Sequence, residues 1–141
     1  MSERRQYLLD TNILSETRRK QSDQRVIEFL SATDASALYI SVLTLGELRK
    51  GVALKKRIDP DTAKRLAHWV DGLGYSFADR ILGIDAATAT VWGELSAQRP
   101  RPVIDTLLAA TAIAHELIFV TRNTSDVQDT KANLLNPWKK G

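Results

Sequence analysis

The sequence predicts an α/β fold, a three-layer α/β/α sandwich in which a mostly parallel central sheet lies between two layers of helices. Short apolar runs alternate along the chain with longer segments whose apolar residues recur at helical spacing. Strands that alternate with helices are joined by right-handed crossovers, which align the strands in parallel and cover both faces of the sheet. The 141 residues contain no internal repeat and no long linker, so we expect a single domain over residues 1–141.

Apolar runs mark the candidate strands. Residues 7–9 (YLL) are entirely apolar, which is typical of a central strand in a parallel sheet. The further candidates, in chain order, are residues 38–41, 81–84, 117–121 and 134–135. We expect the last of these at an edge of the sheet.

Helical patterns fill the segments between these runs. They predict helices from about residue 13 and over residues 23–31, 42–54, 60 to about 72, 85–98 and 103–115. Thr11 or Asn12 is the expected N-cap of the first helix. Gly72 and Gly74 are expected to end the fourth helix. Two prolines place residues 99–102 in a loop.

The composition excludes several classes of protein. The chain has no cysteine, so disulfides, thiolate metal sites and cysteine nucleophiles are ruled out. No run approaches the roughly 18 consecutive apolar residues of a membrane span, and the first apolar run is too short for a signal peptide. We therefore expect a soluble, intracellular protein. The net charge of +3 is compatible with a nucleic-acid partner but is not an argument for one.

Four acidic side chains stand where a soluble domain seldom needs a charge. Asp10 ends the first apolar run, Asp126 follows the run at 117–120, and Glu47 and Asp105 interrupt apolar helical segments. The functional crevice of an open parallel sheet lies beyond the carboxyl ends of its strands, and the first turns of the following helices point toward the same edge. The four acids could therefore converge, and gathered carboxylates stay ionised together only around a cation.

The type of side chain indicates which cation this would be. Carboxylate oxygens without thiolate or imidazole partners favour Mg²⁺ or Mn²⁺ over zinc. Such an ion polarises a phosphoryl oxygen, orients a water nucleophile and stabilises the leaving oxygen. The predicted reaction is therefore hydrolysis of a phosphodiester bond.

Each acid also has a purely structural interpretation. Asp10 could cap the following helix, and Glu47 could close a capping box with Thr44. Asp105 could complement a helix dipole, and Asp126 could simply occupy a polar turn. Coincidence of all four structural roles is less common than any one of them.

Several segments resemble the motifs of PIN domains of the VapC/FitB type, and they occur in the expected order over nearly the whole chain. These segments are residues 8–16 (LLDTNILSE), 41–51 (SVLTLGELRKG), 105–112 (DTLLAATA), 120–123 (VTRN) and 134–138 (LLNPW). The resemblance implies a Mg²⁺-dependent endoribonuclease in which Mn²⁺ can substitute. It also implies the toxin component of a bacterial toxin–antitoxin pair, acting in the cytoplasm.

The resemblance further implies site residues and partners. Asp10, Glu47 and Asp105 match the metal ligands of the family and are the expected catalytic residues. Family members act on RNA and are typically neutralised by a small antitoxin whose tail wraps the toxin. They commonly form homodimers, and the complex often binds its own promoter DNA through the antitoxin.

The sequence departs from the family at the fourth acidic position. Many relatives have an aspartate where Asn123 stands, and the nearest acid here is Asp126. Either Asp126 supplies a fourth carboxylate, or Asn123 contributes an amide oxygen or a water contact. The loss of one negative charge would weaken Mg²⁺ binding. Thr11, Asn12 and Thr121 resemble residues that position water or support the ligands, and roles in caps and turns explain them equally well.

Basic residues are the candidates for RNA contact. Positive charges occur in clusters at residues 18–20, 49–50, 55–57, 99 with 101, and 139–140. A protein that holds a polyanion needs such charges, although solvated helix faces explain each cluster equally well. Arg49 and Arg122 are the stronger candidates because each is close in sequence to a motif residue. Trp69, Trp92 and Trp138 could stack on unpaired bases, but core or interface packing is the commoner role.

Two other functions are compatible with the sequence. The first is a PIN-like binding subunit with little or no catalysis, which would complete an antitoxin-containing DNA-binding repressor complex. Asn123 is the best support for it. The second is an aspartate-nucleophile phosphatase, which also begins with an aspartate at a strand end. That chemistry usually needs a second aspartate two residues later, where this chain has Asn12, so it ranks below the others.

Overall fold

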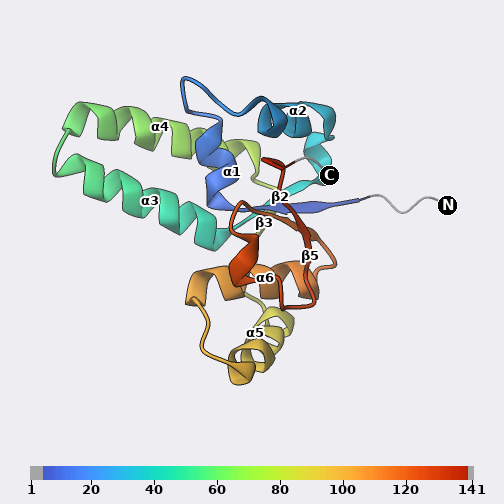
Figure 1. Ribbon diagram of the computed structural model, residues 1–141. Helices are drawn as coiled ribbons and strands as arrows, with labels where there is room; N and C mark the ends of the chain where they lie inside the picture. The colour runs from blue at the N-terminus through green and yellow to red at the C-terminus, as the bar shows by residue number, and fades with distance from the viewer. Residues whose placement is uncertain (1–4, 140–141) are drawn as a thin grey trace.

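A computed structural model describes residues 5–139, so Lys140 of the last basic cluster lies outside the described part of the chain. Five strands form one parallel sheet in the order β3-β2-β1-β4-β5 (Figure 1). The strands are β1 (Tyr7–Leu9), β2 (Leu38–Ser41), β3 (Ile81–Leu82), β4 (Ile118–Val120) and β5 (Asn133–Leu135). The parallel sheet, the central place of β1 and the edge position of β5 are confirmed.

Helices cover both faces of the sheet. They are α1 (Thr11–Glu16), α2 (Gln24–Ala32), α3 (Val42–Lys56), α4 (Pro60–Ser76), α5 (Ala86–Gln98) and α6 (Val103–Ala114), with short 3-10 turns η1 (Ala35–Ala37) and η2 (Thr124–Asp126). Figure 1 shows α1 to α4 on one side of the sheet and α5 with α6 on the other. The predicted three-layer α/β/α arrangement is therefore confirmed.

A separate hydrophobic core fills each space between sheet and helices. Successive side chains of a strand point to opposite faces, so Leu8 and Leu9 of β1 enter different cores. Leu9 packs with residues of α1 to α4 such as Ile13 and Val70, whereas Leu8 packs with Leu108 of α6. Both faces of β1 are thus buried, as its apolar run predicts.

Two predicted helix ends were wrong. The fourth helix continues through Gly72 and Gly74 to Ser76. Neither glycine has a positive φ, and burial of Leu73 and Phe77 against the core outweighs the cost of about 1 kcal/mol for each glycine in a helix.

Among the helices of residues 5–139, none has the length and apolar character that a membrane span needs.

The first helix also begins earlier than predicted. Helix α1 starts at Thr11, and its N-cap is Asp10 rather than Thr11 or Asn12. The acid that ends β1 therefore begins the next helix without an intervening loop. This tight connection fixes Asp10 at the boundary between strand and helix.

Candidate active site

The candidate site lies at the edge of the sheet where the strands end. Asp10 directly follows β1, and its N–H donates to the carbonyl of Val120 at 2.9 Å, which extends the pairing of β1 with β4. Thr121 follows β4, and its N–H donates to the carbonyl of Leu135 in β5 at 3.0 Å. The neighbouring strand ends therefore place Asp10 beside Thr121 at the carboxyl edge of the sheet.

The Asp10 carboxylate is buried and accepts two hydrogen bonds. Its side chain is 5% exposed. Oδ2 accepts from the Thr121 hydroxyl at 2.7 Å, and Oδ1 accepts from the Thr11 N–H at 2.7 Å. Burial raises the pKa of Asp10, the two hydrogen bonds lower it, and the negative charge of Glu47 raises it again. Asp10 thus caps a helix, as its structural interpretation predicts, and is also a desolvated acid.

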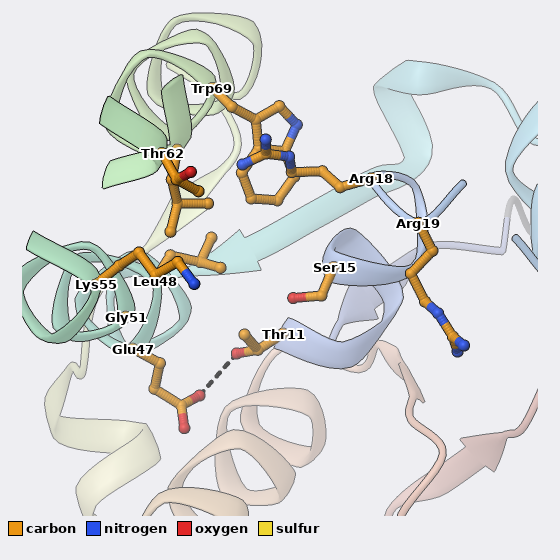
Figure 2. A pocket seen from close by; sticks show the side chains of 11 residues that line it. Thr11, Ser15, Arg18, Arg19, Glu47, Leu48, Gly51, Lys55, Thr62 and Trp69 are labelled. Carbon is orange, nitrogen blue, oxygen red and sulfur yellow. Dashed lines mark hydrogen bonds between the residues drawn. The ribbon is translucent and has the colours of Figure 1, made fainter. Parts of the chain in front are cut away.

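Glu47 reaches the site from the second turn of α3. Its Oε1 accepts from the hydroxyl of Thr11 at 2.7 Å, as Figure 2 shows. The capping box with Thr44 is absent, because the N-cap of α3 is Ser41, whose hydroxyl accepts from the Leu43 N–H at 3.0 Å. Thr44 is instead fully buried inside the helix. The capping interpretation of Glu47 was therefore wrong, and its carboxylate faces α1.

Asp105 completes the acidic group from the first turn of α6. Its side chain is partly buried. Burial raises the pKa of Asp105, and the negative charges of Asp10, Asp126 and Glu47 raise it further. Asp105 therefore lies within reach of the charges of the three other acids, and Asp10 within reach of Glu47. In the conformations found within residues 5–139, no three acidic or histidine side chains close tightly enough to enclose an ion.

The two candidates for the fourth position differ in what they contact. Asp126 is exposed in η2, and its charge acts on Asp105. Asn123 is exposed, and its N–H donates to the Thr121 hydroxyl oxygen at 3.1 Å. Asn123 therefore supports the hydroxyl that holds Asp10, while Asp126 is the acid near Asp105. Asn12 lies in α1 and has a buried Oδ1 without a hydrogen-bond partner among the described residues.

The two arginines predicted to bind RNA occupy different environments. Arg122 directly follows Thr121, is exposed, and has its guanidinium over the ring of Trp138 at 5.1 Å. Trp138 itself is buried in the core, as expected. Arg49 is paired with Asp71, which links α3 to α4. Arg122 is therefore the one of the pair that lies next to a residue of the acidic edge, and RNA binding by both stays a prediction.

The arginines of the 99–102 loop form an ion-pair cluster around one aspartate. Arg99 binds Asp129 through Nε and Nη2 at 2.8 and 3.0 Å. Arg101, whose side chain is 2% exposed, binds Asp129 through Nη1 and Nη2 at 2.9 and 3.2 Å. Arg99 also donates to the carbonyl of Asp126 at 3.5 Å. The Arg101 side chain is therefore held by Asp129 and is not available to bind phosphate. The loop also joins the start of α6 to the segment that carries Asp126.

A groove opens beside the Thr11–Glu47 contact, between α1, α3 and α4 (Figure 2). Its volume is about 490 Å³. The residues that line it are Thr11 and Ser15 of α1, Arg18 and Arg19 of the turn that follows α1, Glu47, Leu48, Gly51 and Lys55 of α3, and Thr62, Leu66 and Trp69 of α4. The acidic edge is therefore continuous with a longer surface.

Some of these features escaped the sequence reasoning. The groove could have been anticipated from helical spacing, because Glu47, Gly51 and Lys55 are four residues apart and share one face of α3. The role of Asp129 could not, because its arginine partners are 28 and 30 residues away in the chain. No local pattern marks such a contact.

Comparison with known proteins gives one consistent family. A model of the PIN domain family matches residues 7–131. The chain is 33% identical to toxin FitB of Neisseria gonorrhoeae over 93% of this chain and 97% of that protein. It is 31% identical to VapC ribonuclease Y4jK of Sinorhizobium fredii, over 94% and 97% of the two chains.

Solved structures agree with these sequence matches. The structure of FitAB bound to an IR36 DNA fragment superposes with a TM-score of 0.86 and 29% identity, covering 96% of this chain and 97% of that chain. A toxin–antitoxin complex from Klebsiella pneumoniae superposes with a TM-score of 0.66 and 25% identity, covering 95% and 99%. The similarity in both comparisons therefore extends over nearly the full length.

Proposed function

This chain belongs to the PIN-domain family and is of the VapC/FitB type, and we propose its function on that basis. The proposed function is that of a Mg²⁺-dependent endoribonuclease, the toxin component of a toxin–antitoxin pair in the bacterial cytoplasm. The observation that carries it is the position of four acids, Asp10, Glu47, Asp105 and Asp126, at one sheet edge, where the charges of the other three act on Asp105 and that of Glu47 acts on Asp10. The relative named VapC ribonuclease supports the same activity.

The residues at this edge fit a hard divalent cation in their chemistry. The donors are carboxylate oxygens and the chain has no thiol, a combination that favours Mg²⁺ and Mn²⁺. Asp10, Glu47 and Asp105 would hold the ion, with Asp126 as the proposed fourth ligand. A bound ion would offset the repulsion between the acids, polarise a phosphoryl oxygen of RNA and activate a water nucleophile.

The surrounding residues orient these acids. The Thr121 hydroxyl and the Thr11 N–H each bind one oxygen of Asp10, which fixes the plane of the carboxylate. The Thr11 hydroxyl holds Glu47 from the facing helix. Arg122 presents an exposed guanidinium one residue after Thr121, where it can attract the phosphate backbone. Preorganised donors and charges of this kind are what phosphoryl chemistry requires of a protein.

Replacement of one acid tests the proposed function. We expect Asp10→Asn to lower RNA cleavage roughly 100-fold or more, because a metal centre contributes several kcal/mol and each 1.36 kcal/mol is a factor of ten in rate. Asparagine is also a good N-cap, so α1 and the circular dichroism spectrum should be preserved. The control is Asp23→Asn, the same change at the N-cap of α2. A folded Asp10→Asn protein that cleaves RNA at the wild-type rate would contradict the proposal.

The proposal extends to partners. We expect a small antitoxin protein as the inhibitor, a second copy of the chain in a homodimer, and promoter DNA bound through the antitoxin. The matches to a toxin–antitoxin complex and to FitAB bound to DNA support an antitoxin and a DNA-bound assembly. A co-expressed antitoxin that fails to suppress RNA cleavage would count against this part.

A second candidate function is a binding subunit of a DNA-binding repressor complex with little catalysis. Asn123 favours it, because an amide stands where the resemblance to the family predicts an acid. Expression of the chain alone in a bacterial host separates the two functions. Growth arrest that Asp10→Asn abolishes supports the enzyme, and unimpaired growth with full-length protein present supports the binding subunit.

A further inference from the structure

We infer that the groove between α1, α3 and α4 holds unpaired nucleotides of the RNA strand next to the phosphate that is cut. This inference rests on the proposed function. Thr11 and Glu47, which are joined by a hydrogen bond, line the end of the groove at the acidic edge. A strand whose phosphate lies among the acids can therefore continue past Thr11 and Glu47, which Figure 2 shows side by side, into the groove.

The charges along the groove favour a polyanion as its occupant. Arg18, Arg19 and Lys55 line it, and Glu47 is the only acid among its lining residues. Arg19 contacts Glu16 at 3.4 Å. Arg18 and Lys55 have no salt bridge within residues 5–139, so both can bind phosphate. Cations that follow the backbone of a strand are the main source of affinity for nucleic acids.

The wall of the groove suits nucleobases. Leu48 and Leu66 supply apolar surface, and Trp69 supplies an aromatic ring that is only partly buried. Figure 2 shows the Arg18 side chain extending from the turn after α1 to Trp69, and its guanidinium lies over the ring at 5.1 Å from the centroid. Unpaired bases stack on tryptophan rings and on planar guanidinium groups alike.

The size of the groove matches this occupant. A volume of about 490 Å³ falls within the range of roughly 300–1,000 Å³ that is usual for small-ligand sites. It is therefore suited to a short stretch of nucleotides rather than to a folded partner. A peptide segment of a protein partner is the competing occupant, and the charge of the lining residues is the argument against it.

Gly51 allows the groove to be filled without disturbing the fold. It lies on α3 in the groove, and a Cβ added there meets no atom within 4 Å. Leucine is a better helix former than glycine, so Gly51→Leu should fold at least as stably. The matched control is Gly72→Leu on α4, where the added Cβ is equally unhindered and the residue does not line the groove.

RNA binding is measured separately from cleavage. Both substitutions are made in the Asp10→Asn protein, and the affinity for a short single-stranded RNA is measured by fluorescence anisotropy. We expect Gly51→Leu to weaken binding roughly tenfold or more, the loss of about one stacked base, and Gly72→Leu to leave it unchanged. Arg18→Ala should weaken binding and reduce the salt dependence by about one phosphate contact.

The alternative outcomes are distinct. RNA binding that is unaffected by both Gly51→Leu and Arg18→Ala would overturn the inference. Loss of binding to a co-expressed antitoxin, with RNA binding intact, would assign the groove to a protein partner and overturn it too. Failure of the proposed function would be seen in a different experiment, as RNA cleavage that persists in the Asp10→Asn protein. The RNA affinities of the groove variants could still be compared in that case.

Discussion

The two carboxylate oxygens of Asp10, a proposed metal ligand, have different hydrogen-bond partners. One oxygen caps α1 by accepting from the Thr11 N–H, and the other accepts from the hydroxyl of Thr121. Both bonds favour the ionised form, which burial opposes. The two hydrogen bonds therefore hold the Asp10 carboxylate in a fixed position at the end of the strand, although burial disfavours its charge. The residue that the sequence marks as unusual is thus unusual for a physical reason.

The Thr121 hydroxyl should carry a measurable share of this arrangement. Thr121→Val keeps the shape and removes the donor, so we expect the free energy of unfolding to fall by roughly 1.5–3 kcal/mol, the usual worth of a hydrogen bond to a charged group. Thr121→Ser keeps the donor and loses one methyl group, which costs about 0.8 kcal/mol. Urea unfolding measures both variants. A valine variant as stable as the serine variant would show that the hydroxyl does not hold Asp10.

At the scale of elements, Asp129 joins two loops that approach the site from different parts of the chain. Arg99 and Arg101 precede α6, which carries Asp105, and the segment of Asp126 and Asp129 follows β4. Hydrogen bonds from Arg99 and then from Arg101 hold the pKa of Asp129 well below its usual range. The cluster therefore ties the loop before one acid to the segment of the other.

The lowered pKa of Asp129 predicts how its contribution depends on pH. An acid with a lowered pKa in the fold stabilises fully above its ordinary pKa of about 4, and the stabilisation is lost as the pH falls below that value. We therefore expect Asp129→Asn to lower the unfolding temperature at pH 7, with the difference from wild type narrowing below about pH 4. Calorimetry over this range measures it, with exposed Asp61→Asn as control. A difference that is equal at both ends of the range would contradict this assignment.

Two elements show where a local sequence pattern predicts the structure correctly and where it does not. The apolar run at 7–9 predicted a central strand because every residue in it had to be buried, and β1 is buried on both faces. Gly72 and Gly74 wrongly predicted a helix end, because their weak local preference is smaller than the burial of Leu73 and Phe77. Local propensity therefore failed where tertiary packing was strong.

At the scale of the whole molecule, the topology accounts for the candidate site. The order β2-β1-β4 places the end of β1 beside the end of β4, so Asp10 contacts Thr121, which is 111 residues away in the sequence. The alternation of strands and helices predicted this parallel arrangement, and with it the common edge for Asp10, Glu47 and Asp105. The Asp129 cluster and the arginine–tryptophan contacts were not predictable, because they join residues without any periodic relation in sequence.

A crystal of the protein soaked in Mn²⁺ tests most directly whether the four acids share one ion. Mn²⁺ scatters anomalously and takes the same carboxylate ligands as Mg²⁺. We predict an anomalous peak bonded to Asp10 and Asp105 at about 2.1 Å, with no peak in the Asp10→Asn protein. Saturating Mn²⁺ that gives no peak there, or a peak that persists without the Asp10 carboxylate, would contradict a shared metal centre.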